Sequence, residues 1–385
     1  MRTTRFFLAS FFVTVLAYTA IGKAEDVDLY SGLSGSAGTP NMMFVVDSSA
    51  NSSGNFPACT YYDGTSPSLG NTTLGNEQCA LVNILNALPT KTDGSALIQL
   101  GIVSSDGIWL PLTPIDDKVY VNASSYTGAY TVPAGVTNRQ AFIGAVKALT
   151  KHTGAVVQGP QMQETWAYYT GGNGGSTGTG LLSGNAFSGT NAKTGCQKNF
   201  AAFLGGVDTN AHADIGNSAP VANAPVILNA AVDNAYTANL ISQDQQTLYK
   251  TTITTGAQPD KYAGNGVARE WSRFMLNFDV NTNSTGTQSI TTYSIAIVGG
   301  ANTDMTNFIK DLGNFGGGKA FSATSYSEIY NSILKILNEV QAVNSVFASS
   351  SLVFKSTCSC CDNLSRVSIS LISFFKSSFS PAFSV

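Results

Sequence analysis

Three oxygen-bearing side chains at every second position, Asp47, Ser49 and Asn51, follow directly on a short apolar run over residues 42–46. A continuous apolar run of this length predicts a strand buried on both faces of a sheet. In open α/β sheets, ligands bind outside the carboxyl ends of such strands. Mg2+ and Ca2+ prefer oxygen ligands in proteins. The stretch therefore predicts a site for a divalent cation, Mg2+ or Ca2+, at the end of the first strand. The alternative is that Asp47 caps a helix and binds nothing, because Asp and Ser are common turn and cap residues.

The apolar periodicity of the chain predicts strands that alternate with helices. Strands are expected over residues 42–46, 96–104, 199–204, 289–298 and 319–322. Helices are expected over 76–88, 138–151, capped by Asn138, and over 160–170, 233–249, 262–278, 304–312 and 326–344. This alternation indicates an α/β fold with a doubly wound, mostly parallel sheet flanked by helices. Insertions are expected at 59–79, at 105–137 as a small hairpin carried on the main fold, and at 171–195 as a flexible loop.

The first 24 residues have the pattern of a signal peptide. Arg2 and Arg5 precede an apolar run, and small residues at Gly22 and Ala24 predict cleavage after Ala24. The alternative is an uncleaved membrane anchor. Export permits disulfides, and Cys59 with Cys79 is the natural pair, closing a loop of about 20 residues and stabilising the fold by about 3 kcal/mol. Cys196 has no obvious partner in the sequence.

Composition and motifs argue against several functions. The net charge of −3 and the pI near 5.4, with no cluster of Lys and Arg, offer no basic face for nucleic acid. Residues 313–319 match part of a phosphate-binding loop, but a helix is expected before them and a strand after them, so no nucleotide partner is predicted. The two histidines, His152 and His212, give little basis for a catalytic triad.

The run that begins at Asp47 resembles the metal-ion-dependent adhesion site of von Willebrand factor A domains, which reads Asp-x-Ser-x-Ser after the first strand. Asn51 departs from that pattern, so the site here is expected to be weaker or degenerate. The resemblance implies two further ligands from later loops, a Thr and an Asp, for which the nearest candidates are Thr153 and Asp208. It also implies a von Willebrand factor A-like fold over residues 25–352.

Several segments in order resemble the PilC/PilY family of type IV pilus tip adhesins and pilus-biogenesis factors. The most specific is LNEVQAVNSVFAS at 337–349, and the others are EDVDLY at 25–30, PN at 40–41, CQKNF at 196–200, TYSI at 292–295 and GGGKAFSAT at 316–324. The resemblance implies a protein of the cell surface, pilus tip or outer membrane that takes part in pilus assembly and adhesion. Its implied partners are minor pilins or the pilus tip and a surface or host-cell receptor, and no enzyme activity is expected.

The chain departs from that family after residue 352. Family members continue into a β-propeller, whereas residues 353–385 form an atypical tail rich in Ser, Phe and Cys, which we interpret as the product of a frameshifted or truncated gene. A genuine short segment that docks on the domain is the alternative. Two other functions stay open: a secreted hydrolase or other metal-dependent enzyme on the same fold, and a structural pilus component without metal.

Overall fold

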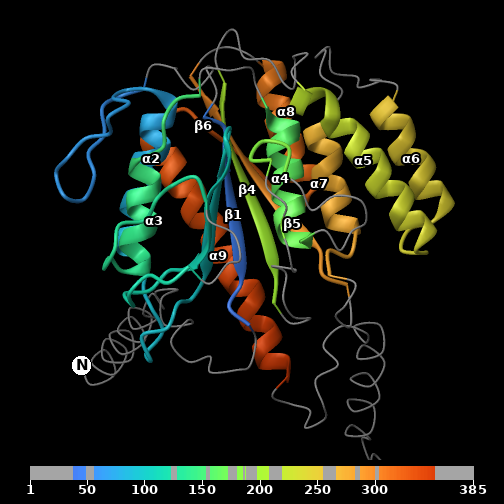
Figure 1. Cartoon of the computed structure of the whole chain (residues 1–385). Helices are drawn as coiled ribbons and strands as arrows, with labels where there is room; N and C mark the ends of the chain where they lie inside the picture. Colours follow the sequence, from blue (N-terminus) through green and yellow to red (C-terminus); the bar gives the residue numbers. More distant parts are fainter. Residues whose placement is uncertain are drawn as a thin grey trace, which may run out of the picture.

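A six-stranded sheet forms the centre of the molecule (Figure 1). The computed structural model describes residues 38–48, 56–122, 128–152, 157–171, 180–184, 187, 197–207, 219–254, 266–281, 287–299 and 303–351. The strands are β1 (Asn41–Val46), β2 (Gln99–Ser104), β3 (Gly107–Pro114), β4 (Asn199–Val207), β5 (Ile290–Val298) and β6 (Gly317–Ala323). Their order is β3-β2-β1-β4-β5-β6, and β3 alone runs antiparallel to its neighbour.

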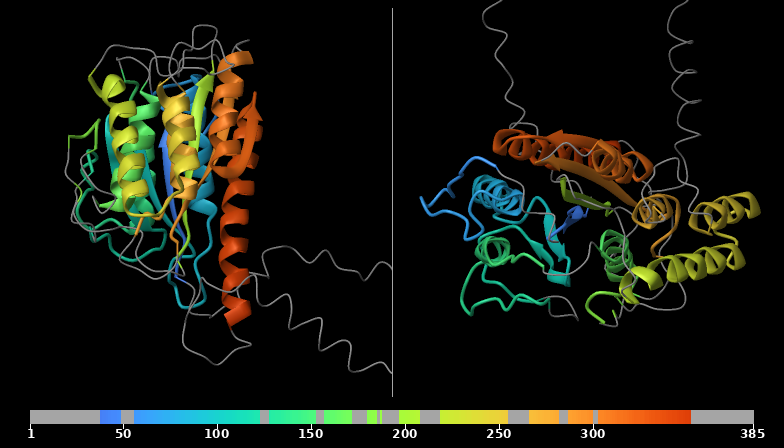
Figure 2. Two further views of the ribbon diagram at one scale, coloured as in Figure 1. Left: turned by 90° about the vertical axis from the view of Figure 1, so that its right-hand side faces the viewer. Right: turned by 90° about the horizontal axis from the view of Figure 1, so that it is seen from above.

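Helices cover both faces of the sheet (Figure 2). They are α2 (Thr73–Ala87), α3 (Asn138–Lys147), α4 (Gln158–Thr170), α5 (Ala219–Thr237), α6 (Gln243–Thr254), α7 (Val267–Asn277), α8 (Thr303–Phe315) and α9 (Tyr326–Ser351). The first face packs against α2, α3 and α9, and the second against α4, α7 and α8. Helix α5 packs on α4 and α7, and α6 packs on α5 and α7, outside the layer that touches the sheet. None of the described helices is long and apolar enough to cross a membrane.

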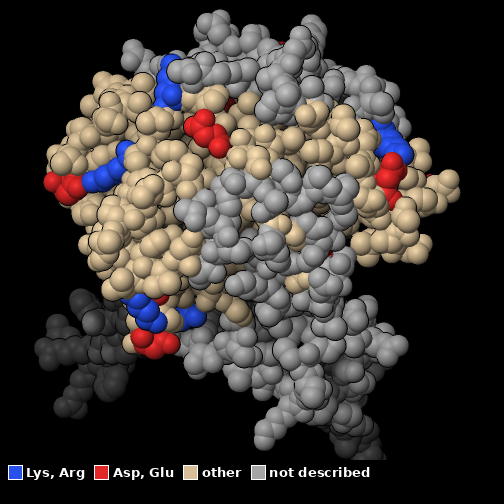
Figure 3. Space-filling view, viewed as in Figure 1, with Lys and Arg blue, Asp and Glu red and all other residues tan. Residues whose placement is uncertain are grey.

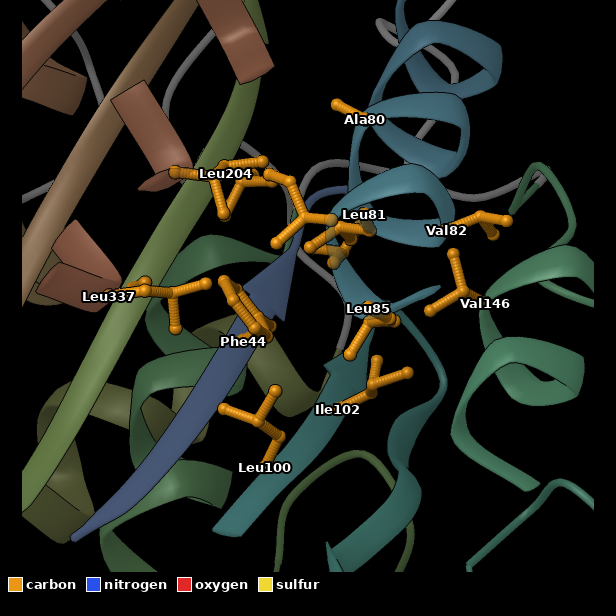
Figure 4. Close-up of a cluster of buried hydrophobic side chains, with 14 of the residues drawn as sticks. Phe44, Ala80, Leu81, Val82, Leu85, Leu100, Ile102, Val146, Leu204 and Leu337 are labelled. Atoms are coloured by element: carbon orange, nitrogen blue, oxygen red, sulfur yellow. The ribbon is translucent and has the colours of Figure 1, made fainter. Parts of the chain in front are cut away.

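Strand β1 lies between β2 and β4, and all six of its residues are buried. Alternate side chains point to opposite faces of a strand. Phe44 therefore joins the core under α2, whereas Met43 and Val45 join the core under α4. Leu81 and Leu85 of α2 pack in the same cluster as Phe44, and Figure 4 shows this contact between helix and sheet. A strand buried on both faces explains the continuous apolar run in the sequence.

The α/β fold expected from the sequence, a doubly wound, mostly parallel sheet with helices on both faces, is confirmed. Between β1 and β4 the strand order reverses, so this pair forms the switch point at which ligands of open α/β sheets bind.

The segment 105–137 differs from the expected hairpin. Residues 107–114 form β3, an edge strand of the main sheet that pairs with β2 through a tight turn at Ser105 and Asp106. From residue 115 to 137 the described part holds one isolated bridge, between Val119 and Thr137. The turn formers of this segment thus follow the edge strand instead of closing a separate hairpin. Gly107 permits the tight turn because its φ of 100° is unfavourable for other residues.

The expected helix over 233–249 is wrong, since α5 ends at Thr237 and α6 begins at Gln243. The break contains Asn239 in a left-handed conformation, with φ of 57°. Ser242 and Gln245 then form reciprocal side chain–backbone hydrogen bonds at the start of α6. This is a capping box, which starts a helix and therefore interrupts the helical pattern.

The cap of α3 also differs from the expectation. Thr137, not Asn138, caps the helix: its hydroxyl accepts from Gln140 N, and the Gln140 side chain accepts from Thr137 N. Asn138 instead donates to Asp116 at 2.7 Å, which ties the helix to the segment after β3. The helix ends at Lys147, and Gln78 of α2 donates to the carbonyls of Val146 and Leu149, satisfying groups that a helix end leaves open.

Candidate metal centre

Asp47 lies directly after β1 at the carboxyl edge of the sheet and is 1% exposed. Its backbone N donates to Leu204 O in β4 at 2.9 Å. Gln158 Nε2, in the first turn of α4, donates to Asp47 Oδ2 at 3.0 Å, and Gln161 Nε2 donates to Val46 O at 2.8 Å. The start of α4 thus fixes both the end of β1 and the orientation of the carboxylate.

Ser48 joins two further loops to this edge. Its hydroxyl accepts from Ser105 N, directly after β2, at 3.2 Å. Its carbonyl accepts from His152 N, beyond the end of α3, at 2.7 Å. His152 in turn contacts Asp106, with 2.7 Å between Nδ1 and Oδ1. The loops after β1, β2 and α3 therefore meet beside Asp47.

The other four predicted metal ligands, Ser49, Asn51, Thr153 and Asp208, lie outside the described residues. Three of them directly follow described residues: Ser49 follows Ser48, Thr153 follows His152, and Asp208 follows Val207. Ser48 contacts His152, as above, and Val207 ends β4, which is the neighbour of β1. The chain thus approaches the carboxyl edge from each of the predicted segments, and the ligand roles of these four residues stay predictions.

Glu77 is a buried carboxylate that the sequence analysis missed. It lies in the second turn of α2, is 0% exposed, and neither of its oxygens has a hydrogen-bond partner among the described residues. Burial, followed by the negative charge of Asp47, raises the pKa of Glu77 well above its ordinary value. A signal was present in the sequence, because Glu77 is four and eight residues before Leu81 and Leu85 and so shares their inward face.

The chemistry of this edge suits a hard divalent cation. Asp47 and Glu77 supply carboxylate oxygens, and the buried hydroxyl of Ser105 has no hydrogen-bond partner in the described part of the chain. Oxygen donors of this kind are the ligands of Mg2+ and Ca2+. No group of three His, Cys, Asp or Glu side chains lies together within the described residues, so a complete set of ligands draws on hydroxyl, amide or backbone oxygens or water.

Cys59 and Cys79, the predicted disulfide pair, are unbonded thiols in this structure and interact with each other. A hydrogen bond with Cys79 lowers the pKa of Cys59, and the same interaction together with burial raises the pKa of Cys79. Cys79 is buried on α2, whereas Cys59 is partly exposed. The neighbouring thiols are compatible with the disulfide, which stays a prediction that the mass of the unreduced protein would test.

The segment that partly matches a phosphate-binding loop has the expected inverted order. Helix α8 contains Gly313, and the strand β6 begins at Gly317. Lys319 pairs with Glu339 of α9, with 2.5 Å between Nζ and Oε1.

On the face shown in Figure 3, the described charged side chains are few, scattered and of both signs.

No family model matches the chain, and no curated protein matches it. Among solved structures, it is similar to a mutant of the PilB minor pilin from Streptococcus sanguinis, at 12% identity and a TM-score of 0.40, over 81% of this chain and 63% of that one. It is similar to BatB, a conserved hypothetical protein from Bacteroides thetaiotaomicron, at 8% identity and a TM-score of 0.35, over 80% of this chain and 99% of that one.

A third similar structure is proximal thread matrix protein 1 from the mussel byssus with a zinc-occupied MIDAS motif, at 11% identity and a TM-score of 0.32. That match covers 80% of this chain and 46% of the other. The chain therefore spans under two thirds of the pilin and under half of the byssus protein. Similarity at this level carries no argument about what this chain binds or does.

Proposed function

We propose that this chain is a type IV pilus-associated protein that acts in pilus assembly and in adhesion to surfaces or host cells, through a divalent cation held at the carboxyl edge of its sheet. One observation carries the proposal: the buried carboxylate of Asp47 stands at the switch point between β1 and β4, oriented by Gln158. The sequence resemblance to pilus tip adhesins supports the pilus-related part. The partners are minor pilins or the pilus tip and a surface or host-cell receptor.

The residues of this edge are suited to the proposed adhesion and need no catalysis. Gln158 and Gln161 hold the end of β1 in place, and Ser48 joins the loops that frame it. A bound Mg2+ or Ca2+ would supply a coordination position for an acidic group of a partner. Recognition of that kind needs a preformed set of oxygens and no bond making or breaking, so we propose a binding protein and no enzyme.

A calorimetric titration of Mg2+, Ca2+ and Mn2+ into the full chain tests the metal part of the proposal. Asp47→Ala is expected to abolish binding, because it removes the central carboxylate of the site. Asp244→Ala, an exposed acid on α6, is the matched control and is expected to bind like the parent. Binding that survives in Asp47→Ala would place the cation elsewhere, and no binding by the parent would favour a structural component without metal.

The pilus part is tested in the source organism by deleting the gene and restoring it as parent or as Asp47→Ala. We expect deletion to reduce surface pili and attachment, and the parent gene to restore both. Restoration of pili but not of attachment by Asp47→Ala would assign the cation to adhesion. Unchanged pili and attachment after deletion would contradict the proposed function. Hydrolysis of a panel of ester, peptide and phosphate substrates by the purified protein would favour the enzyme alternative.

A further inference from the structure

We propose that Glu77 is a metal-binding residue, the second carboxylate of the Asp47 site, supplied by α2 from outside the run of residues 47–51. This inference rests on the cation-binding part of the proposed function. It identifies a ligand that follows from the packing of α2 on the sheet and not from the spacing of the motif.

The carboxylate of Glu77 has no compensating group in the described part of the chain. Glu77 is fully buried, and within the described part of the chain it accepts no hydrogen bond and forms no ion pair with Lys, Arg or His. An ionised carboxylate buried in this way is strongly unfavourable unless a cation or hydrogen-bond donors compensate it. A cation from solution is the compensating charge that the described residues do not provide.

Asp47 is a second buried acid at the edge of the sheet that α2 covers. Leu81 packs in the same cluster as Phe44 of β1, so Glu77, one turn earlier in α2, and Asp47, directly after β1, are both buried at the same edge of the sheet. Two carboxylates buried at one site repel each other when both are ionised. A divalent cation between them neutralises both and removes the repulsion. Two carboxylates and a divalent ion also give a neutral set, which suits a buried position.

Hydrogen bonds of the adjacent residues hold Glu77 in a fixed position. Its neighbours on both sides are anchored: Asn76 Nδ2 donates to Pro57 O at 3.3 Å and to Thr72 O at 3.1 Å, and Gln78 donates to the end of α3. Leu81, one turn later on the same face, packs in the cluster that contains Phe44 of β1 (Figure 4). Glu77 is therefore held on the inward face of α2, one turn nearer to the carboxyl edge than Leu81.

The test compares Glu77→Gln, which keeps the shape and removes the charge, with the parent. We titrate MgCl2, CaCl2 and MnCl2 into the full chain by calorimetry and record thermal unfolding with EDTA and with each ion. Glu77→Gln is expected to bind at least tenfold more weakly and to lose most of the rise in Tm that the ion gives the parent. In EDTA its Tm is expected to equal or exceed that of the parent, because a buried acid without a compensating partner has been removed.

Glu164→Gln is the matched control, since Glu164 is also a buried glutamate but accepts hydrogen bonds from the residues at 182 and 183. It is expected to bind the ions like the parent. Glu77→Met, which suits the apolar face of α2, is the second variant and is expected to reproduce the loss seen with Gln.

The outcomes separate the two proposals. Unchanged affinity in Glu77→Gln and Glu77→Met, with binding lost in Asp47→Ala, would overturn the role of Glu77 and leave the proposed function standing. No binding by the parent would overturn both. A large fall in Tm for both Glu77 variants in EDTA would mark Glu77 as a structural residue and would also overturn the inference.

Discussion

Two buried glutamates on opposite faces of the sheet have opposite surroundings. Glu270 on α7 has a side chain that is 1% exposed and forms ion pairs with Arg269 and Arg273, and Arg269 also pairs with Asp311 on α8 at 3.2 Å. Glu77 on α2 is equally buried, but its charged neighbour is Asp47, another acid. The first carboxylate is compensated by the chain itself, and the second is not.

The contrast distinguishes a structural charge from a functional one. The carboxylate of Glu270 is compensated by arginines of its own helix, one of which also pairs with Asp311 of α8, and it needs nothing from outside. An uncompensated one lowers stability and is expected where a ligand supplies the missing charge. Glu164 lies between these extremes, because it is buried and accepts hydrogen bonds from neutral donors, Leu182 N at 3.1 Å and the Ser183 hydroxyl.

The largest effect is expected for Glu270→Ala, which leaves Arg269 and Arg273 with side chains only 7% and 15% exposed and without their shared partner. Removing one member of a buried ion pair typically costs about 3–5 kcal/mol. Urea denaturation of variant and parent measures the loss. A loss near zero would mean that the arginines find other partners, and the contrast with Glu77 would fail.

For Glu77→Met in EDTA at pH 7 we expect the opposite sign. The substitution removes an uncompensated buried acid from an apolar face, so the free energy of unfolding is expected to rise by roughly 1–2 kcal/mol. Urea denaturation under the same conditions gives the comparison with Glu270→Ala. Destabilisation instead would show that the packing around Glu77, and not its charge, governs the stability contributed by this position.

Glu164→Gln is expected to change the pH dependence of stability. Burial raises the pKa of Glu164, so between its ordinary value near 4.5 and its higher value in the folded state, the folded protein holds a proton that the unfolded chain releases. Raising the pH through that window therefore lowers stability, by at most about 1.4 kcal/mol per pH unit for one group. Urea denaturation from pH 4 to pH 8 is expected to give a flatter profile for the variant. An identical pH dependence of stability in variant and parent would contradict the raised pKa of Glu164.

The smallest effect is expected for Asp63→Asn. Hydrogen bonds from Lys147 and Thr65 lower the pKa of this exposed acid, and Lys147 Nζ lies 2.6 Å from Asp63 Oδ2. The contribution of the pair to stability is full above the pKa of aspartate in the unfolded chain and is lost progressively as the pH falls toward the lower folded value. Because surface pairs contribute little, the Tm is expected to shift slightly at pH 7 and less at pH 3. A larger shift at pH 3 would have the wrong sign.

Much of the fold was predictable because local pattern and tertiary role agree. The apolar run at 42–46 became β1, and the expected strands at 289–298 and 319–322 correspond to β5 and β6. The wrong predictions of secondary structure lie where tertiary contacts outweigh the local sequence pattern. Residues 107–114, which contain two prolines, were expected within a separate small hairpin over 105–137, yet pairing with β2 makes them an edge strand of the main sheet, a position where proline is tolerated.

The sequence by itself determined the alternation of strands and helices and the position of Asp47 directly after a buried strand, since both are properties of neighbouring residues. Tertiary structure alone decided the surroundings of that carboxylate. Gln158 lies 111 positions after Asp47 in the chain, and a long segment separates Asp47 from Glu77. No rule of residue spacing joins the three side chains. The packing of α2 and α4 against β1 brings them together, so the charge balance of the site is set by how the helices are placed on the sheet.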